Sequence, residues 1–101
     1  MNDRIAGIPK AALERVLAGE RARFEAAHPR SRAFAARSAA HWLQGVPMHW
    51  MGDWGTPVTL FLQSARGAEL TDVDGNTYAD FCLGDTGAMF GHSPEPVARA
   101  L

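Results

Sequence analysis

The feature that most constrains the fold is a run of three short strand-like segments within residues 58–83. The segments are residues 58–63, 68–73 and 77–83, and the turns between them are Ala65-Arg66-Gly67 and Asp74-Gly75-Asn76. β-Branched and aromatic residues recur in the segments, as is typical of strands. An Asp-Gly pair supplies the positive φ of a tight hairpin, and Asn tolerates the same conformation. The pattern therefore predicts a small three-stranded antiparallel sheet with the topology of a meander.

Helix-forming sequence lies on both sides of this sheet. Residues 9–27 are strong helix formers, and Pro9 suits a first helical turn. His28 and Pro29 interrupt the pattern, because a proline disfavours the helical conformation of its predecessor, and a second helix is expected at residues 31–43. Another helix is expected to begin near Glu95. The predicted fold class is α+β, with two N-terminal helices, the sheet and the start of a further helix.

The domain organisation follows from these elements. We assign residues 1–44 to the N-terminal helices and residues 45–101 to a loop, the antiparallel meander and the beginning of the next helix. The last helix has no Gly, Asn or Pro stop signal before Leu101. We therefore expect one incomplete domain, which is also consistent with the modest length of 101 residues.

Composition and charge narrow the class of protein. A hydrophobic share of 47% and a charged share of 21% are those of a globular chain, not of a disordered one. Residues 1–40 hold eight Lys+Arg against four Asp+Glu, but the interspersed acids argue against a transit peptide or a nucleic-acid arm. With one cysteine, no signal peptide and no long apolar run, we expect a cytoplasmic protein without a membrane or nucleic-acid partner.

A Gly- and Pro-rich stretch at residues 45–57 is expected to be a loop. It carries Met48, Trp50, Met51 and Trp54, which is too apolar for an idle linker. Two interpretations stay open. Its large side chains pack in a core, or they line a pocket.

Motifs of metal and phosphate binding are incomplete. The segment beginning at Asp72 resembles a calcium loop, but its glycine is fourth instead of sixth and its twelfth residue is Leu83 instead of Glu. Residues 84–91 are glycine-rich but lack a dinucleotide or phosphate-loop pattern. A zinc site is not expected, because the one cysteine and the histidines lack the close spacing of ligand pairs. These residues are Cys82, expected to be a small apolar residue in a strand, His41, expected on a helix surface, His49 and His92.

The chain offers no group for covalent catalysis. Its only lysine, Lys10, begins a helix and has no visible apolar environment to lower its pKa. Sequence therefore predicts no catalytic, cofactor-binding or metal-binding residue.

The order of the motifs along residues 45–101 is more informative than any one of them. Gly55-Thr56-Pro57 is followed by Leu60-Phe61-Leu62, by residues 65–81, which read Ala-Arg-Gly-Ala-Glu-Leu-Thr-Asp-Val-Asp-Gly-Asn-Thr-Tyr-Ala-Asp-Phe, and by Gly91-His92-Ser93-Pro94. This order resembles the opening of class III aminotransferases of the glutamate-1-semialdehyde aminomutase type. In that family a G-T-P stretch leads into a strand, a G-x-x-L/W-x-D-x-D-G-x-x-Y-x-D core follows, and a G-H-x-x-P type element opens the next helix.

The resemblance implies an enzyme of fold type I that uses pyridoxal 5'-phosphate (PLP). It implies a homodimer with active sites near the subunit interface and a small-molecule amino donor or acceptor. In the family the lysine, aspartate and phosphate-binding turn that hold PLP lie farther along the chain than this sequence extends. The expectation is thus an N-terminal fragment that is inactive alone. The alternative is a non-catalytic binding or dimerisation module derived from the same fold.

The resemblance also implies two pocket segments. Met48, His49 and Trp50 fall near the family's N-S-P-V-R-type stretch, and Asp85 and Thr86 fall near its S-W-G. The first segment lacks the arginine, and Asp85 stands where an aromatic residue is common. His92 is expected to order the loop before its helix and not to carry a proton in the reaction.

Overall fold

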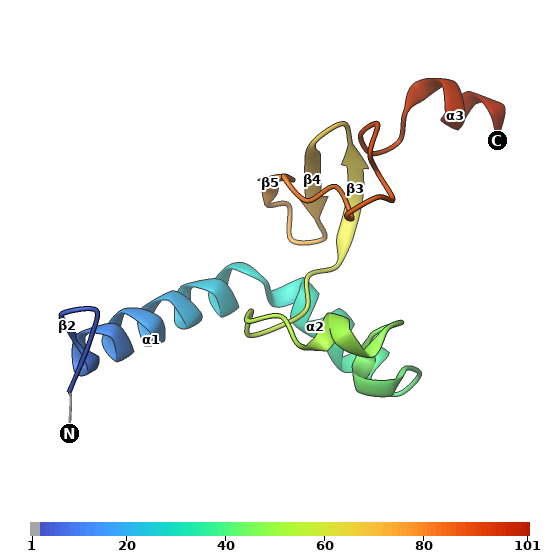
Figure 1. Cartoon of the computed structure of the whole chain (residues 1–101). Helices are drawn as coiled ribbons and strands as arrows, with labels where there is room; N and C mark the ends of the chain where they lie inside the picture. Colours follow the sequence, from blue (N-terminus) through green and yellow to red (C-terminus); the bar gives the residue numbers. More distant parts are fainter. Residues whose placement is uncertain (1–2) are drawn as a thin grey trace. The chain divides into compact units, whose positions relative to one another are not determined.

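The structure is a computed structural model that describes residues 3–101, and the chain divides into two compact units (Figure 1). The first unit is Met1–Thr59 and the second is Leu60–Leu101. This division differs from the predicted boundary at residue 44, because the loop of residues 45–57 packs with the helices before it. Gly45 carries that packing, since a Cβ on it would lie 3.4 Å from the amide nitrogen of Ala39 and 3.5 Å from the carbonyl oxygen of Ala35.

The first unit begins with a short hairpin that the sequence analysis did not predict. Strands β1 (Arg4–Ile5) and β2 (Ile8–Pro9) pair antiparallel across Ala6 and Gly7, both at positive φ. The Nε of Arg4 donates to the carbonyl of Gly7 at 2.8 Å. Pro9 then precedes helix α1 (Lys10–Ala27), which confirms the predicted first helix.

His28 separates the two predicted helices. Its ring stacks on Phe24 with centroids 4.0 Å apart, and its Nδ1 donates to the Phe24 carbonyl at 2.6 Å. Helix α2 (Pro29–Ser38) follows directly, with proline in its first turn.

The second helix is five residues shorter at its C-terminal end than predicted. After α2 the chain turns through the 3₁₀ segment η1 (Leu43–Gly45), where Gln44 and Gly45 have positive φ. The close approach of Gly45 to α2 requires this reversal, so tertiary packing overrides the helical propensity of residues 39–43. His41 is therefore exposed in a turn after α2, not on a helix surface as expected.

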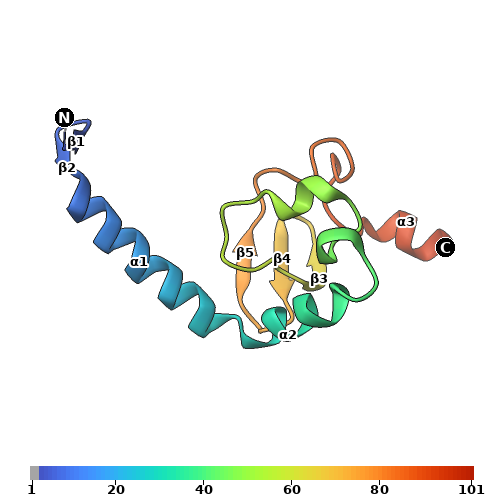
Figure 2. The same cartoon turned by 90° about the horizontal axis from the view of Figure 1, so that it is seen from below.

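The second unit contains the predicted three-stranded antiparallel sheet, with strand order β3-β4-β5 (Figure 2). Its strands are β3 (Leu62–Arg66), β4 (Glu69–Asp72) and β5 (Thr77–Ala79). Arg66 pairs with Glu69, so the first turn is the two-residue loop of Gly67 and Ala68. The predicted first strand, residues 58–63, therefore begins four residues too early. Ala65 and Arg66, which the prediction placed in the turn, are the last two residues of β3. The turn at Asp74-Gly75-Asn76 is confirmed, with Gly75 at φ 91°.

The last strand ends at Ala79 instead of residue 83. The next residue, Asp80, accepts hydrogen bonds from the backbone amides of Cys82 and Leu83, which takes these amides out of the sheet. Cys82 is therefore an exposed residue of a bend, and the expectation that it packs in a strand was wrong. Helix α3 (Glu95–Ala100) begins at the predicted residue.

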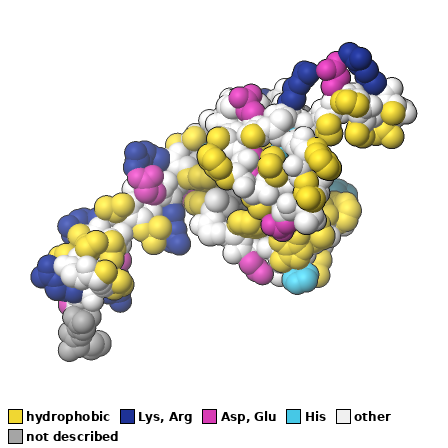
Figure 3. Space-filling model, turned by 45° about the horizontal axis from the view of Figure 1, so that its top comes forward, with side chains coloured by type: hydrophobic (Ala, Val, Ile, Leu, Met, Phe, Trp, Pro, Cys, Tyr) yellow, Lys and Arg dark blue, Asp and Glu magenta, His cyan; other side chains and the backbone are white. Residues whose placement is uncertain are grey.

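Little of the apolar surface is covered in the described residues. The buried hydrophobic side chains are Val46 and Val73, whereas α1 has no buried residue. Hydrophobic side chains are visible over much of the surface in Figure 3. Within residues 3–101, no helix has both the length and the apolar character needed to cross a membrane.

Candidate functional site

The sheet of the second unit is organised around one buried carboxylate. Asp72, at the end of β4, is fully buried. Its Oδ1 accepts from the amides of Asp74 and Asn76 at 2.9 and 2.8 Å. Its Oδ2 accepts from Asn76 Nδ2 at 3.0 Å and from the hydroxyl of Tyr78 at 2.8 Å. These four bonds join β4, the turn and β5.

The hydrogen bonds determine the acidity of this group. Burial alone would raise the pKa of Asp72, but the bonds from the Asn76 side chain and amide, from Tyr78 and from the Asp74 amide together lower that pKa. Burial raises the pKa of Tyr78 to about 12, and the hydrogen bond to Asp72 and its charge act in the same direction. Asp72 is thus an ionised acceptor and Tyr78 a protonated donor near neutral pH. Their arrangement is structural, because Asp72 is fully buried and its carboxylate is occupied by the hydrogen bonds within the sheet and turn.

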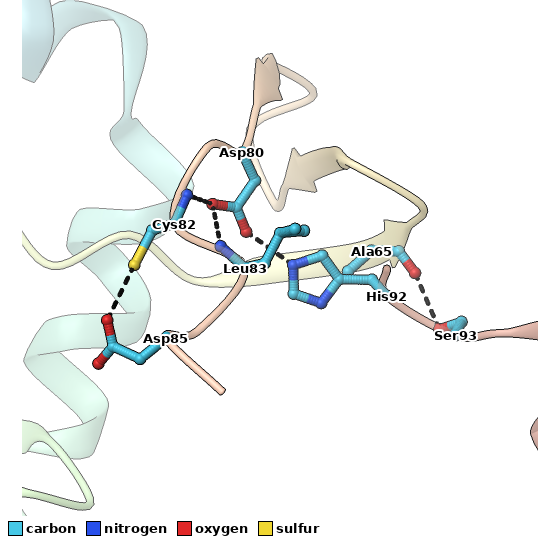
Figure 4. Close-up of polar contacts among 7 residues, drawn as sticks. All are labelled: Ala65, Asp80, Cys82, Leu83, Asp85, His92 and Ser93. Atoms are coloured by element: carbon cyan, nitrogen blue, oxygen red, sulfur yellow. Dashed lines mark hydrogen bonds and ion pairs between the residues drawn. The ribbon is translucent and has the colours of Figure 1, made fainter. Parts of the chain in front are cut away.

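A second carboxylate organises the loop that follows the sheet. Asp80 Oδ1 accepts from the amides of Cys82 and Leu83, both at 2.9 Å, and Asp80 Oδ2 lies 2.7 Å from His92 Nε2 (Figure 4). The hydrogen bond to His92 is the largest influence that lowers the pKa of Asp80, and the Leu83 amide contributes in the same sense. His92 thus contacts the same carboxylate that accepts from the first amides of the loop.

The backbone around His92 is also fixed. Gly67 and His92 exchange two backbone hydrogen bonds of 2.9 and 2.8 Å, and Ser93 Oγ donates to the Ala65 carbonyl at 2.9 Å. Gly91 has φ 86°, and a Cβ on it would lie 3.1 Å from the Cα of Gly67. Only glycine allows this approach without a shift of one backbone. The residues before α3 are thereby joined to the β3–β4 turn.

The loop between these fixed ends carries Asp85 and Thr86, two of the predicted pocket residues. Both are exposed, and Asp85 has φ 57°. The Asp85 carboxylate lies 3.5 Å from Cys82 Sγ (Figure 4). Thr86 borders a surface hollow of about 460 Å³ that residues 86–94 and Val97 line. The structure thus presents both side chains to solvent at one loop.

The other three predicted pocket residues lie together in the first unit. His49 and Trp50 belong to the 3₁₀ segment η2 (His49–Gly52), and Met48 is the residue before it. The Met51 amide donates to the Met48 carbonyl at 3.0 Å, which closes the turn. About half of each of the Met48 and Trp50 side chains is exposed. These side chains therefore do not form a core.

The position of the lysine bears on whether PLP could bind to the described residues. Lys10 is the only lysine of the sequence, and it is exposed at the first position of α1. It borders neither the hollow beside Thr86 nor a second hollow of about 350 Å³ between α1 and residues 55–57. In residues 3–101 there is also no group of three or more His, Cys, Asp or Glu side chains that could hold a metal ion. No step of a PLP reaction can be derived from these residues.

Sequence reasoning missed the roles of Asp72, Tyr78 and Asp80. All three lie in the quoted D-x-D-G-x-x-Y-x-D stretch, so the signal was present. This stretch was used for a turn and for the family resemblance, and no hydrogen-bonding roles were assigned to its side chains.

Comparisons with known proteins extend this description. No protein-family model matches the chain. The chain is 46% identical to glutamate-1-semialdehyde 2,1-aminomutase of Methanosphaera stadtmanae over 41 residues. The matched residues make up 41% of this chain and 10% of that protein. Over 45 residues, it is 42% identical to the protein of the same name from Methanocella arvoryzae, covering 45% of this chain and 11% of that protein.

Solved structures match over a larger part of the chain. A lysine-to-alanine variant of glutamate-1-semialdehyde aminomutase from Pseudomonas aeruginosa PAO1, in complex with PMP, is 46% identical with a TM-score of 0.82, covering 89% of this chain and 20% of that one. A β-phenylalanine aminotransferase from Variovorax paradoxus is 29% identical with a TM-score of 0.77, covering 86% and 20%.

The chain therefore spans about a tenth of the curated relatives and a fifth of the solved structures that it matches. Over that part it resembles glutamate-1-semialdehyde aminomutases and class III aminotransferases, as the motif order indicated. Its fold is that of an N-terminal fragment of a fold-type-I PLP enzyme.

Proposed function

We propose that this chain is the N-terminal part of a PLP-dependent class III aminotransferase or aminomutase that acts as a homodimer on an amino acid or amino ketone. The observation that carries the proposal is the TM-score of 0.82 at 46% identity over 89% of the chain to an aminomutase in complex with PMP. PLP, when bound, acts as an electron sink for reactions at an amino-bearing carbon. The residues of this chain contribute the frame and part of the pocket wall, and other residues of the enzyme hold the cofactor.

The chain alone is expected to be inactive. Its single lysine lies away from both hollows, so PLP has no amine with which to combine at either of them. Incubation of the purified chain with PLP and borohydride is expected to leave no specific label beyond that of a surface lysine. Labelling at one site together with measurable transamination would overturn this part of the proposal.

The pocket wall is assigned to Met48, His49, Trp50, Asp85 and Thr86. The three residues of the first loop are exposed in part, and the two of the second loop are presented on an ordered turn. Because the first loop has no arginine, we propose that it contacts the substrate through apolar and imidazole groups instead of binding a carboxylate. The carboxylate of Asp85 adds a negative charge to the second loop.

A chimaeric enzyme tests the proposal. This chain replaces the matched segment of the Pseudomonas aeruginosa aminomutase, and the product is assayed for PLP content and amino transfer. We expect a PLP-bound, active enzyme in which His49→Ala raises KM, whereas Trp54→Ala, a control in the same loop with a side chain 64% exposed, leaves KM unchanged. A folded, PLP-bound chimaera without any amino-transfer activity would refute the assignment.

A non-catalytic module is the second candidate. The observation that favours it is that α1, an 18-residue helix, has no buried residue, whereas helices in proteins gain most of their stability from packing of one face. Such a helix needs a surface to cover it, and a binding or dimerisation module would supply one. A sharp, cooperative thermal unfolding transition of the purified 101-residue chain, whether monomer or dimer, would favour this candidate over the enzyme fragment.

A further inference from the structure

The loop after the sheet is held at both ends by one carboxylate. Asp80 follows β5, and its Oδ1 accepts from the Cys82 and Leu83 amides at the start of the loop. Its Oδ2 pairs with His92 Nε2 at 2.7 Å, at the end of the loop. An ionised carboxylate only accepts hydrogen bonds, so Nε2 of His92 carries a proton. The side chain of Asp80 therefore links the Cys82 and Leu83 amides to the ring of His92, nine to ten residues farther along the chain.

The partner of Asp80 is itself held in place. The backbone of His92 exchanges hydrogen bonds of 2.8 and 2.9 Å with Gly67 of the β3–β4 turn. About a fifth of the His92 side chain and an eighth of the Asp80 side chain are exposed. The pair is consequently shielded in part, where a charge-assisted hydrogen bond is stronger than at an open surface.

The residues between the two ends have little other support. The Phe81 and Phe90 side chains are almost completely exposed. Leu83 and Asp85 adopt positive φ, which is unfavourable for residues with a Cβ. The amide of Ala88 donates to the Leu83 carbonyl at 2.9 Å and that of Gly91 to the Ala88 carbonyl at 2.8 Å. Hydrogen bonds are thus the main support of the loop, in which Leu83, Ala88 and Gly91 are half-buried and the other residues exposed.

We propose that Asp80 and His92 form a clamp that holds residues 81–91 in one conformation, and that both are positioning residues for Asp85 and Thr86. Without the clamp, the positive-φ turn would open and these two side chains would lose a fixed location. The assignment of Asp85 and Thr86 to a substrate pocket rests on the proposed function. The clamp itself does not, because it is defined by contacts within the second unit.

The competing explanation is that the backbone bonds between Gly67 and His92 suffice to order the loop. Two substitutions of His92 separate the explanations. His92→Ala keeps the backbone bonds and removes the clamp. His92→Gln restores a donor, because the amide nitrogen of Gln lies at the same distance along the side chain as Nε2 of His. Ser93→Ala is the matched control, since it removes a neighbouring side-chain bond to Ala65 that lies outside the loop.

The measurement is amide hydrogen exchange by NMR on the full 101-residue chain, with Ala88 and Gly91 as reporters. The amide of Val73, bonded to the Phe61 carbonyl at 2.8 Å, reports on the sheet. For His92→Ala we expect Ala88 and Gly91 to exchange about tenfold faster or more, as the loss of one charge-assisted bond predicts, while Val73 is unchanged. His92→Gln and Ser93→Ala are expected to retain the slow exchange of the unsubstituted chain.

A spectroscopic signature accompanies these rates. In Asp80→Asn, Oδ1 still accepts from the loop amides, but the Nδ2 group now donates to His92 Nε2. The ring nitrogen shifts should therefore show the proton moving from Nε2 to Nδ1. If Asp80 acted only through the bonds of its Oδ1 to the loop amides, Asp80→Asn would leave the tautomer of the His92 ring unchanged.

Three results would overturn the clamp. The first is that Ala88 and Gly91 exchange at an unchanged rate in His92→Ala, and the second is that they exchange fast in His92→Gln while Val73 is still protected. The third is that both amides already exchange fast in the unsubstituted chain. If His92→Ala also exposes Val73, His92→Gln decides alone, and only slow exchange of Ala88 in that variant supports the clamp. None of these outcomes depends on PLP or on amino transfer, so failure of the clamp and failure of the proposed function can be told apart.

Discussion

Replacement of Asp72 by alanine is expected to unfold the second unit. The substitution removes the acceptor of four hydrogen bonds that join β4, the following turn and β5. It also leaves the Tyr78 hydroxyl and two backbone amides without this partner. Because Asp72 is fully buried, water can take the place of the carboxylate as acceptor only if the hairpin opens.

The magnitude follows from the number and kind of these bonds. Each hydrogen bond to a charged group contributes about 1.5–3 kcal/mol, but bonds within one network do not add fully. Each buried donor left without an acceptor costs about 1–3 kcal/mol, so with incomplete additivity we expect a loss of about 3–5 kcal/mol for Asp72→Ala. At about 0.05–0.15 kcal/mol per residue, the free energy of unfolding of residues 60–101 is roughly 2–6 kcal/mol. The loss is therefore comparable with the whole stability of the unit.

The assay is a urea titration followed by NMR, with the Val73 amide and the Tyr78 ring as reporters of the second unit. Tyr78 is the only tyrosine of the chain, so its ring signals are unambiguous. Tyr78→Phe is the graded comparison, because it removes one of the four bonds and is expected to cost about 1.5–3 kcal/mol, less than Asp72→Ala. A folded Asp72→Ala unit whose free energy of unfolding lies within about 1 kcal/mol of the unsubstituted chain would refute the reasoning.

Three further predictions concern the same unit. In an alkaline titration the absorbance of Tyr78 should change near pH 12. The stability that its raised pKa provides should be present below the unfolded pKa of about 10 and lost as pH rises through 12. An absorbance transition near pH 10 in the folded chain would contradict the hydrogen bond to Asp72. The lowered pKa of Asp80 contributes stability that is present above its ordinary value of 3.8 and lost as pH falls through the lowered folded value, so the carboxyl carbon of Asp80 should show its protonation step in NMR only below pH 3.8. Gly91→Ala should destabilise the unit by about 1–2 kcal/mol or more, because residue 91 has positive φ and the new Cβ would lie 3.1 Å from the Cα of Gly67. Gly55→Ala, whose Cβ meets no atom within 4 Å, serves as the control in the same urea titration.

Local chemistry made much of the second unit predictable. The Asp74-Gly75-Asn76 turn demands positive φ at one position, and the structure has it at Gly75. The start of α3 after Pro94 and of α1 after Pro9 was also set by local preferences. These features depend on residues that are close in sequence, so they could be inferred without knowing the tertiary contacts.

Contacts between distant residues could not be predicted in the same way. The end of β5 depends on Asp80, whose partner His92 is twelve residues away. The end of α2 depends on Gly45, which packs against Ala35 and Ala39. In both cases propensity favoured a longer element, and a specific long-range contact ended it earlier. The candidate pocket residues came from the family resemblance, and their role stays a prediction.

The most direct test of the central proposal is to sequence the genomic DNA and its transcript through and beyond the codon for Leu101. The account predicts that the reading frame continues into a long chain with a lysine and a phosphate-binding turn suited to PLP. A stop codon immediately after Leu101 in a transcript that is translated would contradict it, and the second unit would then have to be explained as a module without PLP chemistry.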